Sequence, residues 1–210
     1  MKSSNGHRAL IDAAERLVAE RGLHGVSARE VMRAAGQRNH GAIAYYFGSW
    51  NGLLAAVWAE RSTGMELQAT LVEAADVGDA RLEALTRAYI HPFVAEVAAG
   101  DPSYWARFNE QWLAGIRMDF VGSPETLIPD DPSYPPIPGL EQLQQLYALI
   151  AAELTHLACS NRAARVALAA RFVVSALAAW ERDFVGGVWR DLSTYEAELI
   201  GLTVSLLRSA

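Results

Sequence analysis

Apolar residues recur along this chain with the spacing of helix faces rather than with the alternation of strands. The first predicted helix, Arg8–Glu20, carries apolar residues at positions i, i+4, i+7 and i+8. These residues are Leu10, Ala14, Leu17 and Val18. No segment shows convincing strand alternation. The pattern therefore predicts an all-α protein of about nine helices.

Capping residues divide the beginning of the chain into short helices. A second helix is predicted to begin at Ser27, because Ser27 and Glu30 have the spacing of a capping box, and to stop at Gly36. A third predicted helix covers Asn39–Tyr45, and Ser49 introduces a fourth. Two short helices separated by so brief a turn are typical of a helix-turn-helix.

The remainder of the chain predicts five longer helices. A break at 76–79 precedes a helix with Pro92 in its interior, where a kink is expected near His91. The next helix is expected to start at Asp101 and Pro102. The region 119–138 contains six prolines and is expected to form a long loop. The last three predicted helices are Leu140–Cys159, Asn161–Phe184 and one that opens at Ser193 with a second capping box.

The net charge of −6 is unevenly distributed. Residues 1–59 contain seven Lys or Arg and four Asp or Glu, a charge of +3, whereas residues 60–210 contain eleven and twenty, a charge of −9. This asymmetry favours a nucleic-acid-binding head on an acidic body, although ordinary scatter explains it equally well. A single cysteine excludes an internal disulfide and a cysteine-rich zinc site. With no apolar segment after the first residues, we expect a cytoplasmic protein with no membrane partner.

The predicted third helix opens with Arg38, Asn39 and His40, which carry hydrogen-bonding heads and no acidic group. In a helix-turn-helix, the first residues of the second helix meet the base edges of DNA. Arg can pair with guanine and Asn with adenine, while the phenol groups of Tyr45 and Tyr46 can reach phosphates. The expected DNA-binding residues are Ser27, Gln37, Arg38, Asn39, His40, Ala44, Tyr45, Tyr46 and Ser49.

The segment 8–58 resembles the TetR family of bacterial transcriptional regulators. The positions that carry the resemblance are Ala13-Ala14, Leu17, Gly22, Val26-Ser27, Val31, Ala35-Gly36, Ile43, Tyr45, Phe47, Ser49, Leu53 and Leu54. The turn at 37–41 is one residue longer than the common form, and Trp50 stands where the family usually has Lys. The resemblance implies a DNA-binding domain at 1–48 and a ligand-binding and dimerisation domain at 49–210. It implies a repressor that a small, largely apolar effector releases from a pseudo-palindromic operator.

Aromatic and polar residues of the middle helices are the candidates for the effector site, although such stripes are more often plain core. A pocket is usually apolar with a few polar groups. The candidate residues are Trp58, Met65, His91, Phe93, Trp105, Phe108, Asn109, Trp112 and Tyr147. The predicted helix Asn161–Phe184 is small or apolar nearly all round, so it must be covered on most sides. The resemblance implies that this helix and the last one form a homodimer interface.

A helical-bundle enzyme or metal protein is the alternative. Glu153 and His156 form a Glu-x-x-His pair of the kind that di-iron bundles use twice, but a second pair is absent from the sequence. No phosphate-binding loop or catalytic motif is present. We therefore expect neither a cofactor nor an enzyme activity.

Overall fold

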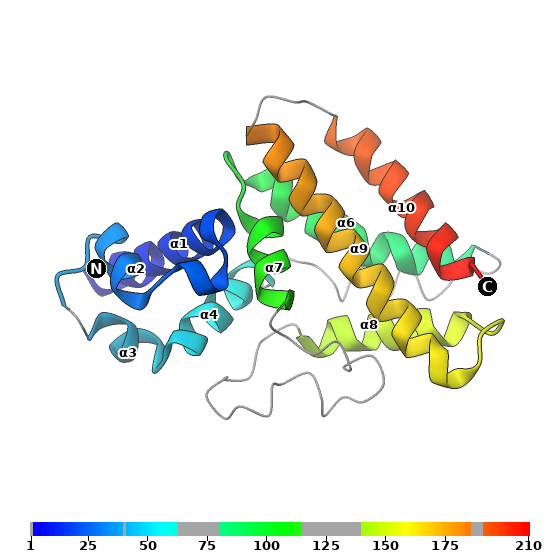
Figure 1. The fold of residues 1–210 in the computed structure, drawn as a ribbon, viewed down its shortest axis with the longest axis horizontal. Coiled ribbons are helices and arrows are strands. Elements are labelled where there is room, and N and C mark those ends of the chain that lie inside the picture. The colour runs from blue at the N-terminus through cyan, green and yellow to red at the C-terminus, as the bar shows by residue number, and fades with distance from the viewer. Residues whose placement is uncertain (1, 40, 63–79, 115–139, 186–190) are drawn as a thin grey trace.

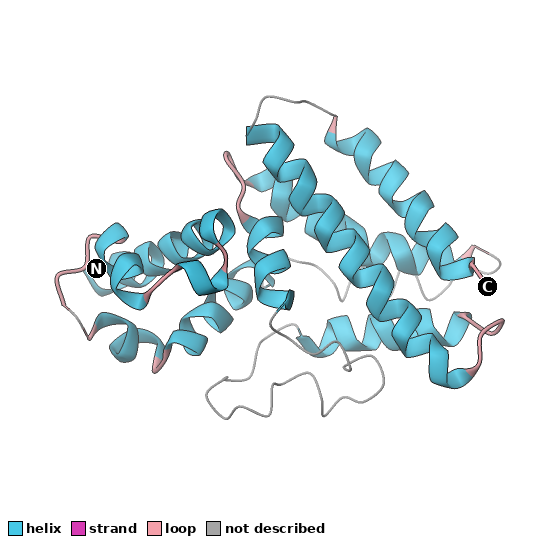
Figure 2. Ribbon diagram, viewed as in Figure 1, coloured by secondary structure: helices cyan, strands magenta, loops and turns pink. Residues whose placement is uncertain are grey.

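The computed structural model describes residues 2–39, 41–62, 80–114, 140–185 and 191–210. These residues form nine α-helices and one short 3₁₀ turn, and none of them is in a strand (Figure 2). The predicted all-α class is confirmed. The expected break at 76–79, the proline-rich region 119–138 and the side chain of Met65 lie outside the described residues.

The chain runs through its helices in the order α1 to α10. Their bounds are α1 Lys2–Arg21, the 3₁₀ turn Leu23–Gly25, α2 Ala28–Ala34, α3 Ala42–Phe47, α4 Trp50–Ser62, α6 Arg81–Ala99, α7 Trp105–Ala114, α8 Leu140–Glu153, α9 Cys159–Val185 and α10 Leu192–Arg208. Helices α1, α2 and α3 form a head at one end of the molecule, and α6, α8, α9 and α10 form the body (Figure 1). Helix α7 packs against both α1 and α9, so it joins the two parts.

The start and end of α2 follow their sequence signals. The hydroxyl of Ser27 accepts a hydrogen bond from the backbone N–H of Glu30, and the carboxylate of Glu30 accepts from the backbone N–H of Ser27 at 3.0 Å. At the other end, the N–H of Gln37 donates to the carbonyl of Met32 and Gly36 adopts φ of +66°. This is a Schellman motif, which favours glycine because its φ is positive. The capping box and the stop at Gly36 are confirmed.

The junction between α3 and α4 depends on a glycine for space. The hydroxyl of Ser49 caps α4 by accepting from the N–H of Gly52 at 2.9 Å. A Cβ atom at Gly52 would lie 2.0 Å from the backbone carbonyl oxygen of Phe47, the last residue of α3. The backbones of α3 and α4 therefore approach each other closely only because position 52 has no side chain.

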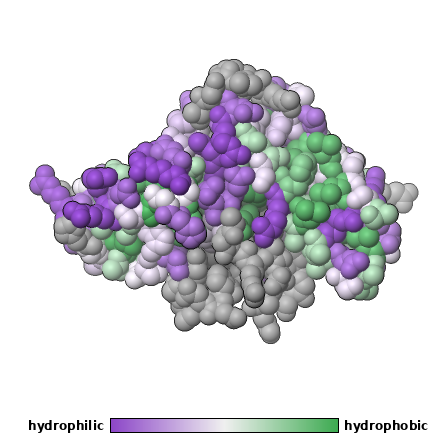
Figure 3. Space-filling view, in the orientation of Figure 1, coloured by the Kyte–Doolittle hydropathy of each residue, from purple (hydrophilic) through white to green (hydrophobic). Residues whose placement is uncertain are grey.

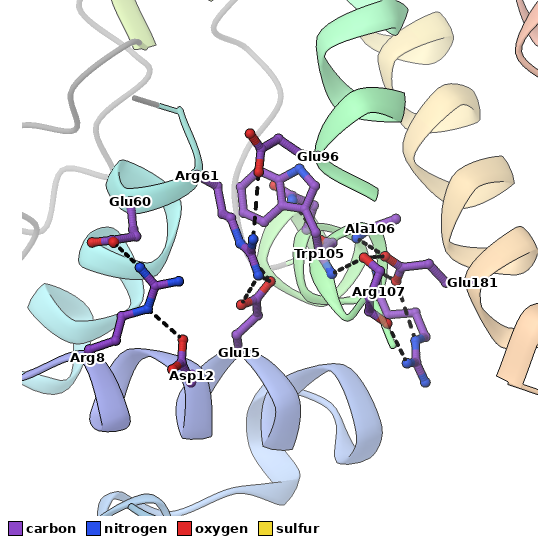
Figure 4. A network of polar contacts seen from close by, with 12 residues as sticks. Arg8, Asp12, Glu15, Glu60, Arg61, Glu96, Trp105, Ala106, Arg107 and Glu181 are labelled. Carbon is purple, nitrogen blue, oxygen red and sulfur yellow. Dashed lines mark hydrogen bonds and ion pairs between the residues drawn. The ribbon is translucent and has the colours of Figure 1, made fainter. Parts of the chain in front are cut away.

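A carboxylate from another helix caps α7. The buried side chain of Glu181, on α9, accepts hydrogen bonds at 2.9 Å from the backbone N–H groups of Ala106 and Arg107, and a further one from the hydroxyl of Ser103 (Figure 4). A negative charge at a helix N-terminus is stabilised by the unpaired N–H groups and the helix dipole. The prediction that α7 starts at Asp101 was wrong, because its first turn is capped by a distant residue.

Two more predicted helix ends were wrong. Helix α8 ends at Glu153, and Cys159 begins α9 instead of ending α8. The residue that caps α10 is Asp191, whose carboxylate accepts from the N–H of Thr194 at 2.9 Å. The hydroxyl of Ser193 donates to this carboxylate as well, so the second capping box does not form. These hydrogen bonds lower the pKa of Asp191 to about 2.

Helix α9 is long and apolar enough, by length and composition, to cross a membrane. One such helix among the described residues is weak evidence for a span, since core helices of globular proteins pass the same test. In this structure α9 packs against α6, α7, α8 and α10. Packing inside the body therefore accounts for the buried part of its apolar surface.

We predict that Gly52→Ala destabilises the protein by about 1–3 kcal/mol, because a backbone carbonyl cannot move aside as a flexible side chain can. The free energy of unfolding, from urea denaturation, measures this effect. Gly25→Ala in the 3₁₀ turn is the matched control, since a Cβ there would meet only the Cβ of Arg21, at the ordinary contact distance of 3.4 Å. It should stabilise the protein by about 0.4–1 kcal/mol. Equal effects of the two substitutions would contradict the close approach of α3 and α4.

Candidate nucleic-acid interface

The second helix of the helix-turn-helix starts later than the sequence predicts. Helix α3 begins at Ala42, with Gly41 as its N-cap, so the prediction that it starts at Asn39 was wrong. Ala42 and Ile43 are buried in the core of the head. Ala44 and Tyr45 are exposed, and these two side chains form the outward face of α3.

The structure places Arg38 and Asn39 in the turn before α3. The side-chain carbonyl of Asn39 accepts from the N–H of Gly41 at 2.9 Å, and its backbone carbonyl accepts from the N–H of Ala42 at 3.2 Å. Such a side chain shapes the turn by hydrogen bonding to its own backbone. Arg38 is exposed beside it. His40 lies outside the described residues.

The two tyrosines of α3 have different surroundings. Tyr45 is 77% exposed, an unusual position for an aromatic residue. Tyr46 is half-buried, and its ring meets that of His7 from α1 edge to face at a centroid distance of 5.9 Å. Tyr45 is therefore available for an external contact, whereas Tyr46 also ties α3 to α1.

The remaining predicted DNA-binding residues are polar groups at helix ends. Ser27 and Ser49 use their hydroxyl oxygens to cap α2 and α4. Gln37 is half-buried, and its side-chain amide lies against Gly6 of α1. Ser27 and Gln37 flank α2, and Ser49 precedes α4. All three therefore lie at the ends of the two helices that pack against α3.

Sequence reasoning missed two arginines on α2. Arg29 and Arg33 are exposed and separated by four residues, so they lie on one face of the helix. Within the described part of the chain, the guanidinium groups of Arg29 and Arg33 form no ion pair and donate no hydrogen bond. The same holds for the guanidinium group of Arg38. The signal was their i, i+4 spacing in a helix that leads into the turn.

The other arginines of the head are paired with carboxylates. Arg16 and Arg21 form ion pairs with Glu20 and Glu30, at 3.3 Å and 3.2 Å. The positive charge that remains for an external polyanion is therefore concentrated on α2 and the turn. Phosphate groups of nucleic acid are the polyanion that this arrangement suits.

The aromatic effector candidates gather in one cluster between α4, α6 and α7. The rings of Phe93, Trp105, Phe108 and Trp112 follow one another in near-parallel pairs with centroid distances of 6.1 to 6.3 Å. Trp58 joins the cluster, 6.4 Å from Trp105 and 6.2 Å from Trp112. All five are buried and belong to the hydrophobic core of the protein.

The polar effector candidates behave differently from one another. Asn109 is buried, but its amide donates to the carbonyl of Trp105 at 2.8 Å, a contact within α7. Tyr147 is buried, and its ring meets that of Tyr89 edge to face, while Tyr89 in turn meets Phe93. His91 does not join the cluster, since its exposed ring contacts Glu196 of α10 at 2.8 Å.

Two donors inside the aromatic cluster have no acceptor. The indole N–H groups of Trp105 and Trp112 are buried, and neither has a hydrogen-bond acceptor among the residues that the structure describes. A buried donor without a partner costs about 1–3 kcal/mol. A molecule that reached these groups with an acceptor atom would recover part of this free energy.

The Glu-x-x-His pair of the alternative interpretation is not arranged for a metal. Glu153 is the last residue of α8 and forms an ion pair with Arg81 at 3.0 Å. His156 lies in the turn beyond the helix, so the two do not share a helix face. Among the described residues, no group of three or more His, Cys, Asp or Glu side chains is placed to hold a metal ion.

The sequence of the head matches a known family. Residues 10–57 match the family described as bacterial regulatory proteins, tetR family. The matched segment runs from the middle of α1 to α4 and contains the whole helix-turn-helix. No curated protein matches the chain.

We predict that Arg29→Ala and Arg33→Ala each weaken binding to DNA of any sequence and reduce the slope of log K against log salt by about 1. The slope is measured by fluorescence anisotropy with labelled duplexes over a range of salt concentrations. Arg87→Ala is the matched control, because Arg87 lies on α6 and is paired with Glu83. A slope that stays the same in both α2 variants would show that this face does not meet phosphates.

Proposed function

The chain is a DNA-binding transcriptional regulator with the N-terminal domain of the tetR family, and we propose that it is a homodimeric repressor released from its operator by a small effector. The observation that carries this proposal is the set of exposed side chains on α2, the turn and α3, namely Arg29, Arg33, Arg38 and Tyr45. It lies on the helix-turn-helix that the family match covers. The proposed domain boundary falls between α3 and α4, at 48/49.

We assign different roles to the residues of the turn and α3. Ala44 and Tyr45 are proposed to approach the base edges, since they are the exposed positions of α3. Arg38 is proposed to reach a base or a phosphate from the turn. Asn39 is proposed to hold the turn, because its side-chain carbonyl is occupied by the N–H of Gly41.

The surface over α9 and α10 supports a dimer. Leu168 on α9 and Leu202 on α10 are each about half exposed, at 52% and 51%. Figure 3 shows hydrophobic surface gathered over these two helices. The exposed positions within one turn of them include small residues, Ala164, Gly201 and Ser205, which allow two helices to approach closely, together with the charged Arg171 and Glu198. An exposed apolar patch of this kind is typical of a protein interface.

We predict that selection from random duplexes yields a pseudo-palindrome whose half-sites lie about 34–36 Å apart or at a multiple of that spacing. Leu168→Glu should give a folded monomer that binds this site much more weakly, since an unpaired charge is costly to bury in an interface. Light scattering and anisotropy measure the two effects.

Ala148→Glu on the exposed side of α8 is the control for that substitution, and it should leave both the dimer and the affinity unchanged. A selected site without inverted symmetry, or a wild-type protein that is a monomer, would refute the dimeric part of the proposal. Failure to select any site would refute the DNA-binding role of the exposed side chains on α2, the turn and α3.

The proposed effector site is the aromatic cluster of α4, α6 and α7. What supports it is the pair of buried indole N–H groups without acceptors among the described residues. Buried donors in a protein core are normally hydrogen-bonded, so an unpaired pair calls for an explanation such as a bound molecule. The effector acts by binding the operator-incompetent arrangement of the two heads more tightly than the competent one. It is expected to be largely apolar with a hydrogen-bond acceptor.

We predict that a compound which releases the protein from its operator shifts the indole N–H resonances of Trp105 and Trp112. Substituting either residue by Phe keeps an aromatic ring and removes the donor. These variants therefore assign the two resonances, and each should bind the compound more weakly than the wild type does. A releasing compound that leaves both resonances unchanged would place the effector site elsewhere. Trp112→Ala should destabilise the protein by about 3–5 kcal/mol.

A further inference from the structure

The last turn of α4 is attached to α1 by two ion pairs. Arg8 contacts both Glu60 and Asp12, and the guanidinium of Arg61 donates to both carboxylate oxygens of Glu15 (Figure 4). Glu60 and Arg61 are neighbours in the chain and have opposite charges, as do their partners on α1. This arrangement fixes the end of α4 to the head at two places.

The Glu15–Arg61 pair is the strong one of the two. Arg61 makes three hydrogen bonds to this carboxylate, at 2.8, 3.0 and 3.2 Å. The side chain of Glu15 is only 4% exposed. Burial raises the pKa of Glu15, and the hydrogen bonds and charge of Arg61 oppose that shift. Separating the pair would leave a buried charge without a partner, which is strongly unfavourable.

The same arginine reaches the body. The third nitrogen of its guanidinium, Nη1, lies 3.7 Å from the carboxylate of Glu96, near the end of α6. Glu96 is 17% exposed, and burial raises its pKa while Arg61 opposes the shift. This contact is longer and closer to solvent than the contact with Glu15. Figure 4 shows Arg61 between the two carboxylates, one from α1 and one from α6.

We infer that the Arg61–Glu96 ion pair is a releasable contact that holds the DNA-binding head in one orientation relative to the body, while Glu15 keeps Arg61 and α4 attached to the head. The unequal burial of the two carboxylates decides which contact opens. Glu96 can meet water when Arg61 moves away, whereas Glu15 cannot. Arg61 is thus a positioning residue for the head, and the inference rests on the proposed function only for its effect on operator binding.

The test compares Glu96→Gln with the wild type. Spin labels are placed on the exposed native Cys159 in the body and on His24→Cys in the head, and labelled subunits are diluted with unlabelled ones. Pulsed electron resonance then reports the distribution of head-to-body distances without DNA. We expect a broader distribution in Glu96→Gln and an operator affinity lower by about fivefold or more, because fewer molecules hold the competent orientation. The melting temperature should change little.

Glu83→Gln is the matched control, since Glu83 lies on the same helix and pairs only with Arg87 within α6. It should resemble the wild type in distance distribution and affinity. An unchanged distribution in Glu96→Gln would overturn the inference, whatever the affinity. If the distribution broadens but no operator is found, the inference holds and the proposed function fails. Arg61→Gln should lower the melting temperature strongly, because it leaves Glu15 buried without its partner. A small effect would overturn the inference that the Arg61–Glu15 contact is the stronger of the two.

Discussion

The head depends on a core that it cannot complete by itself. Two of its three helices, α2 and α3, are short, and a domain of this size buries too little apolar surface to be stable without further packing. Helix α1 connects the head to that further packing, because its buried residues face in more than one direction and pack against α4 and α7 as well as against α2. The DNA-binding part of the chain is therefore continuous with the body. A displacement of α7 or α4 therefore also displaces α1.

The buried carboxylates show how charge is used at this junction. Glu181 is placed against the N-terminus of α7, where backbone N–H groups meet its negative charge, and Glu15 is placed against Arg61. Both lie around α7, one toward the body and one toward the head (Figure 4). A buried charge fixes its partner because the unpaired state is costly. The position of α7 is thus set by directional contacts in addition to apolar packing.

Local signals in the sequence predicted the features that depend on neighbouring residues. The capping box at Ser27, the stop at Gly36 and the cap at Ser49 each involve groups within five residues, and the structure shows all three. The start of α7 could not be predicted in this way, because its cap is Glu181, far along the chain. The start of α3 was misplaced because the turn is longer than usual and Asn39 bonds within it.

In the candidate site too, features set by neighbouring residues could be predicted, whereas features set by tertiary packing could not. Exposed Tyr45 and Arg38 could be named from the helix-turn-helix pattern, whereas the unpaired state of Arg29 and Arg33 depends on which carboxylates fold against the other arginines. His91 was expected beside the aromatic rings because of its position near Pro92, but its face of α6 turns toward Glu196. A helix sequence gives the faces of the helix, and only packing decides which neighbour each face meets.

Helix α4 is the element that connects the aromatic cluster to the ion pairs of the head. Trp58 lies in the cluster, and Arg61 is three residues later on the same helix, where it is held by Glu15. A displacement of Trp58 therefore moves Arg61 with it, since an α-helix transmits motion over one turn almost rigidly. Of the two carboxylates beside Arg61, Glu96 belongs to the body and would stay behind. The cost of separating that pair opposes the displacement, so its strength contributes to the difference in free energy that the proposed effector would have to supply.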